Sequence, residues 1–175
     1  MWSPLATVAL ALALAVQAPA PSSRRPDVVY VPMPDNLVTA LLNLAQVTPH
    51  DFVYDLGSGD GRIPIAAART FGARAIGIEI EPNLVRRSND NLAKAGVGDR
   101  VRFINADLFE SDISAATVVT LFLNPGVNAK LAPKLQHELR PGTRVVSLNF
   151  DMGDTWPPDL TQEVDGMRMF LWTIR

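Results

Sequence analysis

A run of glycines between two acidic residues is the first feature of the chain that could do chemistry. Asp55-Leu56-Gly57-Ser58-Gly59-Asp60-Gly61 follows an apolar segment and precedes a helical pattern. Gly57 and Gly59 allow the backbone to turn tightly and to approach a ligand without a Cβ atom in the way. A glycine-rich turn between a strand and a helix indicates a nucleotide-type ligand. A strand-to-helix turn without a ligand is the alternative.

The residues that follow this run argue against two known kinds of glycine loop. A nicotinamide-type loop needs a third small residue at the position that holds Arg62, because close packing of the helix excludes long side chains there. A phosphate-cradling P-loop is also excluded, since no Gly-Lys-Ser/Thr sequence follows. The pattern therefore disfavours both of these ligand types.

Two acidic residues downstream stand where a nucleoside would need them. Glu79 ends the next expected strand, where related α/β folds place the carboxylate that accepts hydrogen bonds from ribose hydroxyls. A solvated strand end is the alternative, and it is our interpretation of the neighbouring Glu81. Asp107 ends a third strand and can accept from an adenine amino group while Leu108 packs on the ring. For Asp107 alone, a turn or a helix cap is the alternative.

The elements that must position these residues alternate along the chain. Apolar segments predict strands at residues 52–56, 75–80, 101–105, 117–123 and 144–150, with one or two more within 162–175. Helical periodicity predicts helices from a cap at Asp35 to residue 45, and at 63–69, 82–95 and 128–139. Continuous apolar strands are typical of burial on both faces. The pattern predicts one doubly wound, Rossmann-like α/β domain with a seven-stranded, mostly parallel sheet, and a ligand beyond the carboxyl ends of the strands.

Composition excludes several other classes of protein. The 175 residues suffice for one domain with a single core, and they do not suffice for separate cofactor and substrate domains. The formal net charge of -2 argues against a nucleic-acid partner, whose binding needs a clustered basic face. The chain has no cysteine, and His50 and His137 are far apart, so we expect no metal site. The oligomeric state cannot be deduced from these features.

The first 20 residues read as an apolar leader, and residues 21–27 as a linker to a domain at 28–175. Leu5 to Val16 followed by small residues is typical of a cleaved signal peptide, which predicts an exported or periplasmic domain. Arg24 and Arg25 after the apolar run favour the other topology, a membrane-associated protein with a cytoplasmic domain. The run is shorter than a bilayer span. A misplaced start codon is a third interpretation.

The ordered motifs resemble those of a known family. Tyr54 to Arg62, Gly77-Ile78-Glu79-Ile80 and Ala106-Asp107-Leu108 resemble the cofactor motifs of class I S-adenosylmethionine-dependent methyltransferases. More narrowly, the chain from about residue 30 onward is similar to the small lysine methyltransferases that include the enzyme acting on the ATP synthase c subunit. The resemblance implies S-adenosyl-L-methionine as cofactor. It implies that the methionine part is held by Asp55, Gly57, Ser58 and Gly59, the ribose by Glu79, and the adenine by Asp107 and Leu108.

The acceptor side is less well defined by the motifs. The resemblance implies an amine acceptor, in particular a protein lysine on a partner that is soluble or membrane-associated. Asn124 and Pro125 are the candidate catalytic residues, because Asn124 can orient an amine and Pro125 fixes the turn. A plain Asn-Pro-Gly turn is the alternative, and Tyr30 and Trp156 can line the acceptor channel or simply pack in the core. Methylation of a small molecule and a non-catalytic nucleotide-binding scaffold remain as alternative functions.

Overall fold

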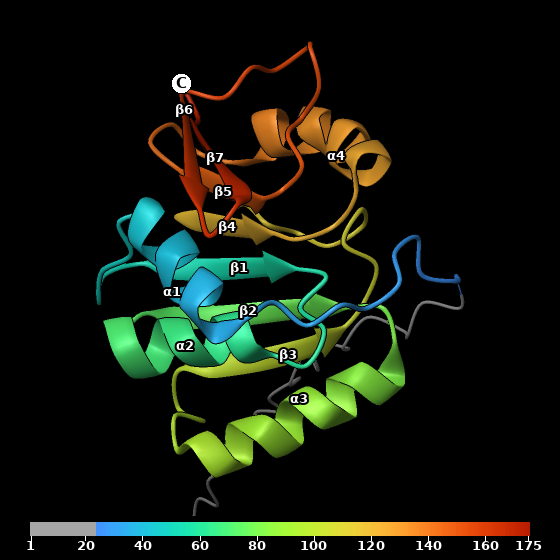
Figure 1. The fold of residues 1–175 in the computed structure, drawn as a ribbon. Coiled ribbons are helices and arrows are strands. Elements are labelled where there is room, and N and C mark those ends of the chain that lie inside the picture. The colour runs from blue at the N-terminus through green and yellow to red at the C-terminus, as the bar shows by residue number, and fades with distance from the viewer. Residues whose placement is uncertain (1–23) are drawn as a thin grey trace, which may run out of the picture.

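A seven-stranded sheet with helices on both faces forms the part of the chain that the computed structural model describes, residues 24–175 (Figure 1). The helices are α1 Asp35–Leu44, α2 Arg62–Phe71, α3 Pro82–Ala95 and α4 Pro125–Glu138. The strands are β1 Phe52–Leu56, β2 Arg74–Glu79, β3 Val101–Asn105, β4 Val118–Leu121, β5 Arg144–Leu148, β6 Leu160–Val164 and β7 Met167–Thr173. The predicted leader and residues 21–23 lie outside the described residues.

The strand order is β3-β2-β1-β4-β5-β7-β6. β1 to β5 run parallel to one another, whereas β7 pairs antiparallel with β5 and β6 antiparallel with β7. The predicted fold class is therefore confirmed. The order reverses between β1 and β4, and such a switch point leaves a crevice beyond the carboxyl ends of the two strands.

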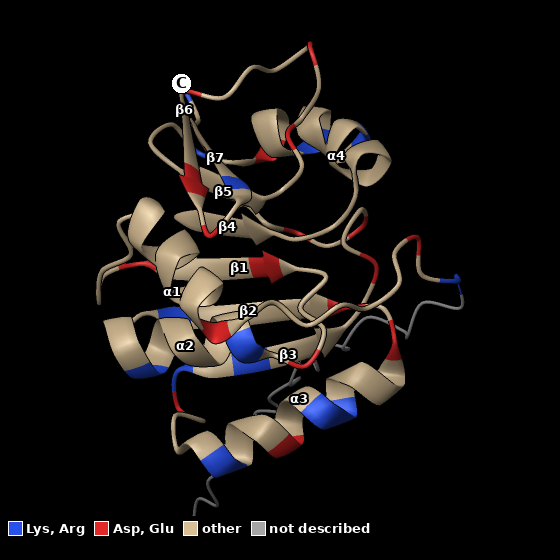
Figure 2. Cartoon of the chain, viewed as in Figure 1, with Lys and Arg blue, Asp and Glu red and all other residues tan. Residues whose placement is uncertain are grey.

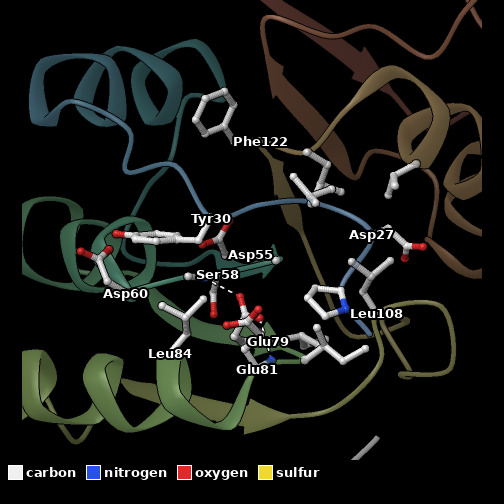
Figure 3. Close-up of a pocket in the computed structure, with 18 of the residues that line it drawn as sticks. Asp27, Tyr30, Asp55, Ser58, Asp60, Glu79, Glu81, Leu84, Leu108 and Phe122 are labelled. Atoms are coloured by element: carbon white, nitrogen blue, oxygen red, sulfur yellow. Dashed lines mark hydrogen bonds between the residues drawn. The ribbon is translucent and has the colours of Figure 1, made fainter. Parts of the chain in front are cut away.

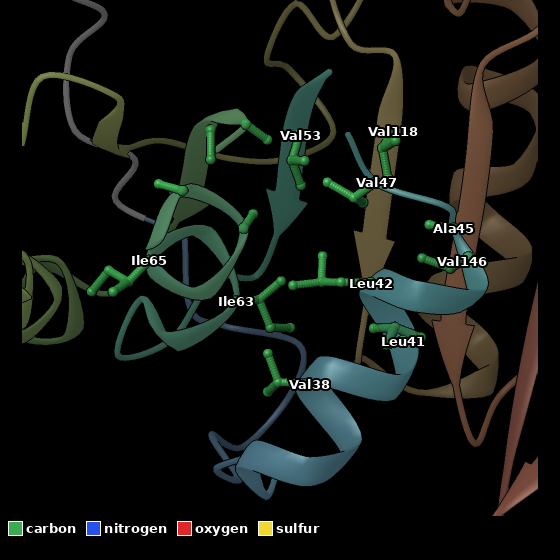
Figure 4. Packing of buried hydrophobic residues seen from close by; sticks show 14 of the residues in the cluster. Val38, Leu41, Leu42, Ala45, Val47, Val53, Ile63, Ile65, Val118 and Val146 are labelled. Atoms are coloured by element: carbon green, nitrogen blue, oxygen red, sulfur yellow. The ribbon is translucent and has the colours of Figure 1, made fainter. Parts of the chain in front are cut away.

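Successive residues of each strand point to opposite faces of the sheet and contribute to two apolar cores, one on each face. Val53 of β1 belongs to the core under α1 and α2, and its neighbour Tyr54 belongs to the core under α4. In the first core, Leu41 and Leu42 of α1 are fully buried and pack toward the sheet (Figure 4). Burial on both faces explains why the parallel strands read as continuous apolar runs.

Several predicted boundaries were wrong, each for a local reason. Asp35 does not cap α1: Pro34 is the N-cap, and Asp35 lies in the first turn, where its charge favours the helix dipole. β4 ends at Leu121 and α4 begins at Pro125, because Asn124 is the N-cap and a proline suits the first helical position. Among residues 24–175, no helix has the length and apolarity to cross a membrane.

Candidate active site

A pocket opens beyond the carboxyl ends of β1, β2 and β4, at the switch point of the sheet (Figure 3). Its walls come from the glycine loop after β1, the end of β2, the segment after β3, and the start of α4. Residues that the sequence marked for the cofactor line it together: Asp55, Gly57, Ser58, Gly59, Glu79, Asp107 and Leu108. The topology thus brings side chains from three separate motifs into one cavity.

The glycine loop has the backbone that its sequence predicts. Gly57 and Gly59 have φ of 82° and 56°, in the left-handed region that favours glycine. A Cβ atom on Gly57 would lie 2.6 Å from Leu123, and one on Gly59 would lie 2.6 Å from the ring of Tyr30. Both glycines therefore keep the loop thin where other walls of the pocket approach it.

The small residue that packs the helix against the sheet is Gly61. A Cβ atom on Gly61 would lie 2.4 Å from the ring of Phe103. Arg62 instead turns its side chain away, to the Asp60 carboxylate and to the carbonyl oxygen of Met33. The close-packing requirement is met one residue earlier than in the nicotinamide-type pattern, which supports the expectation that the loop is not of that type.

Glu79 is a buried carboxylate that the backbone holds in place. Its Oε2 accepts from the N–H of Gly59 across 2.8 Å, and its Oε1 accepts from the N–H of Glu81 across 2.9 Å. Each oxygen keeps further acceptor capacity, so the carboxylate is oriented and still able to accept from ligand hydroxyls. Glu81, which we expected to be a solvated strand end, also lines the pocket and is half-buried (Figure 3).

Asp55 lies at the base of the pocket and is only 2% exposed. Burial, with a smaller contribution from the nearby carboxylates of Glu79 and Asp60, raises the pKa of this carboxyl group to about 7. A hydrogen bond from the hydroxyl of Thr120 opposes the rise of this pKa. Asp55 is therefore poised to change its charge near neutral pH.

Asp107 makes contacts that fit both interpretations of it, a residue of the turn and an acceptor that faces the ligand pocket. Its Oδ1 accepts from the N–H of Phe109 across 2.9 Å, as in a turn, while its Oδ2 accepts from Nε of Arg24 across 2.7 Å and lines the pocket. Burial would raise the pKa of Asp107, but the bonds from Arg24 and Phe109 outweigh burial and lower it. Asp107 thus faces the pocket as a carboxylate.

The predicted catalytic residues occupy the start of α4. Oδ1 of Asn124 accepts from the N–H of Val127 across 2.8 Å and caps the helix, while its Nδ2 donates to the carbonyl oxygen of Asp27 across 3.3 Å. Pro125 is the first helical residue. The neighbours Leu123 and Val127 line the pocket, but Asn124 and Pro125 do not. Their catalytic role stays a prediction, and the turn with a cap is what the structure displays.

Of the two aromatic residues considered for an acceptor channel, Tyr30 lines the pocket and Trp156 does not. The Tyr30 ring covers Gly59, and its hydroxyl points toward Asp60 (Figure 3). Burial raises the pKa of this hydroxyl, and the Asp60 carboxylate adds to the effect. Trp156 packs against Trp172 at 5.7 Å between ring centroids.

Apart from Tyr30, sequence reasoning missed the wall made by residues 24–33, which we call the N-terminal segment. Residues 24–27 were expected to belong to a linker, yet Arg24 and Asp27 line the pocket. Arg24 joins this segment to Asp107, and its guanidinium lies 5.6 Å from the centre of the Phe109 ring. The only sequence signal was a pair of arginines, and Asp107, which Arg24 contacts, is 83 residues away along the chain.

The pocket fits the cofactor that the resemblance implies. The hydroxyl of Ser58 is buried at its wall without a hydrogen-bond partner among the described residues, so it is free to bond a ligand. The wall also has an excess of acidic groups. Its carboxyl groups belong to Asp27, Asp55, Asp60, Glu79, Glu81 and Asp107, and its guanidinium groups to Arg24 and Arg62. This excess favours a cationic occupant, and S-adenosylmethionine carries both a sulfonium and an ammonium group.

Comparisons with known proteins agree with this site. The family model described as the ANTKMT methyltransferase domain matches residues 55–160. A protein-lysine N-methyltransferase from Saccharolobus islandicus is 46% identical over 142 residues, which cover 81% of this chain and 88% of that protein. The Xenopus laevis lysine N-methyltransferase of the ATP synthase c subunit is 35% identical over 153 residues, covering 87% of this chain and 66% of that protein.

A solved structure extends the comparison to three dimensions. The crystal structure of an RNA methyltransferase from Salinibacter ruber in complex with S-adenosyl-L-homocysteine superposes with a TM-score of 0.81 and 56% sequence identity. The match covers 82% of this chain and 94% of that chain. The fold and more than half of the matched residues are therefore shared with a protein that binds the demethylated product of S-adenosylmethionine.

Proposed function

Because the chain belongs to the ANTKMT methyltransferase family and is an S-adenosylmethionine-dependent methyltransferase, we propose that its acceptor is the side-chain amine of a lysine in a protein. The main support for this proposal is the excess of acidic groups on the pocket wall. Six carboxyl groups and two guanidinium groups line it, an arrangement that attracts a cationic side chain and repels an anionic acceptor. Two of the relatives described above are named as lysine methyltransferases.

When bound, S-adenosylmethionine supplies an electrophilic methyl group, which takes the lone pair of a neutral amine as the carbon–sulfur bond breaks. The chain has to hold the two reactants in line and keep the amine neutral. In this proposal, Asp55 and the glycine loop would hold the methionine part, Glu79 the ribose, and Asp107 with Leu108 the adenine.

Deprotonation of the amine needs no strong base in this pocket. A lysine starts with a pKa near 10.4, and an apolar environment lowers that value because it disfavours the charged form. Leu123 and Val127 lie on the pocket wall and belong to the apolar core under α4, and Val28 on the same wall packs against that core. The carboxylates that draw in an ammonium favour its charged form, so desolvation by these apolar side chains has to outweigh them before the proton leaves to solvent through the pocket mouth.

The test is to find where a labelled methyl group goes. The full chain is incubated with methyl-labelled cofactor and a lysate of the source cells, separated into membranes, soluble protein and RNA. We expect label in protein, recovered as methyllysine after acid hydrolysis. Label confined to small metabolites, or to residues other than lysine, would contradict the proposal while leaving the methyltransferase activity intact.

RNA is the second candidate acceptor, because the Salinibacter ruber neighbour at 56% identity is an RNA methyltransferase. The net charge of -2 and the acidic pocket weigh against it, since affinity for nucleic acid depends on neutralising phosphates with basic side chains. The same incubation separates the two acceptors: label that ribonuclease releases, and that protease does not, would favour RNA.

We propose two alternative locations for the domain, on the basis of residues 1–20, which the structure does not describe, and of the two arginines that follow them. Their apolar run and small residues support export of the domain, and Arg24 and Arg25 support retention at the inner side of the membrane. An acceptor lysine in a membrane-associated protein is compatible with either topology. Protease treatment of intact and permeabilised cells that carry a C-terminal tag distinguishes the two locations.

A further inference from the structure

The N-terminal segment leaves an open main-chain edge directly above the pocket. It crosses the mouth from Asp27 to Tyr30 (Figure 3). Within the described residues, the backbone N–H and C=O groups of Val28, Val29, Tyr30 and Val31 make no hydrogen bond. This segment lies outside the helices and strands, and unpaired backbone groups of this kind are a template for pairing with a second chain.

Side chains along this edge alternate as they do in a strand. All four residues line the pocket, but Val28 and Tyr30 are half-buried, whereas Val29 and Val31 are 84% and 60% exposed. Among the described residues, only Leu160 on the far edge of the sheet is another large hydrophobic side chain that is exposed. β-Branched residues suit a paired strand, and two exposed valines beside a binding pocket indicate a contact surface.

We infer that residues 28–31 dock the acceptor as an extended peptide strand, with the acceptor lysine pointing into the pocket and apolar side chains on both sides of it. This inference rests on the proposed lysine acceptor. Three properties select such a partner. The unpaired backbone needs another main chain, the exposed valines need aliphatic neighbours, and the carboxylates below attract an ammonium group.

Strand geometry sets the sequence that fits. Successive side chains of an extended peptide point to opposite faces, so a lysine directed inward, like Val28 and Tyr30, has outward neighbours at the positions before and after it. Those neighbours lie beside Val29 and Val31. The preferred acceptor therefore has the pattern aliphatic-lysine-aliphatic in an extended segment.

The experiment uses the full chain and an acetylated heptapeptide, Ser-Thr-Val-Lys-Val-Thr-Ser amide, with acetyl-lysine methylamide as the minimal acceptor. Two N-methylated versions of the peptide test the main chain. One is methylated on the amides of both valines, and the other on the amides of lysine and of the second threonine. Residues two apart in a strand direct their N–H groups to the same edge, so only one version blocks pairing along a single edge.

We expect the heptapeptide to be methylated with at least about tenfold higher kcat/KM than the minimal acceptor, because it adds main-chain pairing and apolar contact. One N-methylated version should lose that gain and the other should keep it. Equal behaviour of both versions, or no gain of the heptapeptide over the minimal acceptor, would overturn strand docking and leave the lysine assignment standing. If the cofactor binds and no lysine compound is methylated, the proposed acceptor fails and the docking inference fails with it.

A double substitution on the enzyme provides an independent test. Val29→Thr with Val31→Thr keeps the β-branched shape and removes an apolar methyl group at each position. We expect kcat/KM for the heptapeptide to fall about tenfold, with little change for acetyl-lysine methylamide. Leu160→Thr is the matched control, since it removes an exposed apolar side chain elsewhere and should change neither value. A loss of the same size with both acceptors would show that the valines shape the pocket and do not dock a peptide.

Discussion

Asp55 and Thr120 face each other across two parallel strands, and the Thr120 hydroxyl donates to Oδ1 of Asp55 at 2.7 Å. Thr120 is fully buried, and Asp55 is almost so. Asp55 is predicted to help hold the methionine part of the cofactor, and acceptance from the ammonium group of that part would require the ionised carboxylate. With a pKa of about 7 for Asp55, the hydroxyl of Thr120 helps to set the pH range in which the cofactor binds.

Cofactor affinity should therefore increase as the pH rises from 6 to 8, through the pKa of about 7 of Asp55. Thr120→Val removes the bond that favours the carboxylate, so the pKa of Asp55 should rise and the transition should move to higher pH. At pH 7 we expect the dissociation constant to increase about tenfold, from the loss of one charge-assisted hydrogen bond. Calorimetric titration at several pH values measures both effects.

Thr120→Ser is the control, because serine can restore the same hydrogen bond. It should return the pH profile to that of the unmodified protein. If serine and valine shift the profile equally, Thr120 acts through packing and not through its hydroxyl.

The same carboxyl group should make folding stability depend on pH. The pKa of Asp55 is raised from 3.8 to about 7 in the folded state, so the folded chain binds more protons than the unfolded chain between these values, and stability decreases as the pH rises through them. Asp55→Asn keeps an acceptor for Thr120 and removes the buried charge. At pH 8 it should stabilise the ligand-free protein, by up to about 4 kcal/mol, while it weakens cofactor binding.

Urea denaturation of both proteins at pH 5 and pH 8 checks this result. The gain should shrink at pH 5, where Asp55 in the folded protein is already largely protonated. An Asn variant that is less stable at both pH values would contradict the raised pKa.

Glu79→Gln tests the predicted contact with ribose. The charge is lost, and an amide cannot accept from both backbone N–H groups and from ligand hydroxyls as a carboxylate can. Cofactor binding should weaken by roughly 1.5–3 kcal/mol. An analogue of S-adenosylhomocysteine without the ribose hydroxyls should bind both proteins with similar affinity. If the variant loses as much affinity for this analogue, Glu79 acts only by holding the glycine loop.

Elements whose structure depends on local chemistry could be predicted from the sequence. The glycines at 57 and 59 permit the left-handed backbone observed there. The helix Pro82–Ala95 was predicted with its observed bounds because a proline starts it and Gly96 ends it. Continuous apolar strands likewise made the sheet and its switch point predictable.

What the sequence did not reveal depends on contacts between distant residues. In the sequence, Thr120 looks like any other threonine in a strand. Its contact with Asp55 becomes visible only once the pairing register of β1 and β4 is known. Arg24 and Asp27 belong to a stretch rich in Pro, Ser and Arg, which is typical of linkers, and only their bonds to Asp107 and Asn124 make them part of the pocket wall. The residue that packs closely against the sheet is Gly61 and not the residue at position 62. The close contact, with the ring of Phe103, is one residue earlier than in the nicotinamide-type pattern.

Two variants of Asn124 distinguish its role as a helix cap from a role in the reaction. As an N-cap it accepts from the N–H of Val127, and Asn124→Ala should cost about 1 kcal/mol of stability. Asn124→Asp keeps the cap, since aspartate is an equally good N-cap, but it loses the amide N–H that donates to the carbonyl oxygen of Asp27.

The two roles therefore predict different results for the aspartate variant, measured by denaturation and by methylation of acetyl-lysine methylamide. If Asn124 only caps α4 and its amide is dispensable, Asn124→Asp should restore both stability and kcat. If its amide contributes to the reaction, by orienting the amine or by fixing the N-terminal segment above the pocket, stability should return and kcat should stay low. Because Asn124 does not line the pocket and its side-chain oxygen already serves the cap, we expect the aspartate variant to recover most of its turnover. Cofactor affinity should be the same in all three proteins, and a large change in it would show that the start of α4 also shapes the cofactor site.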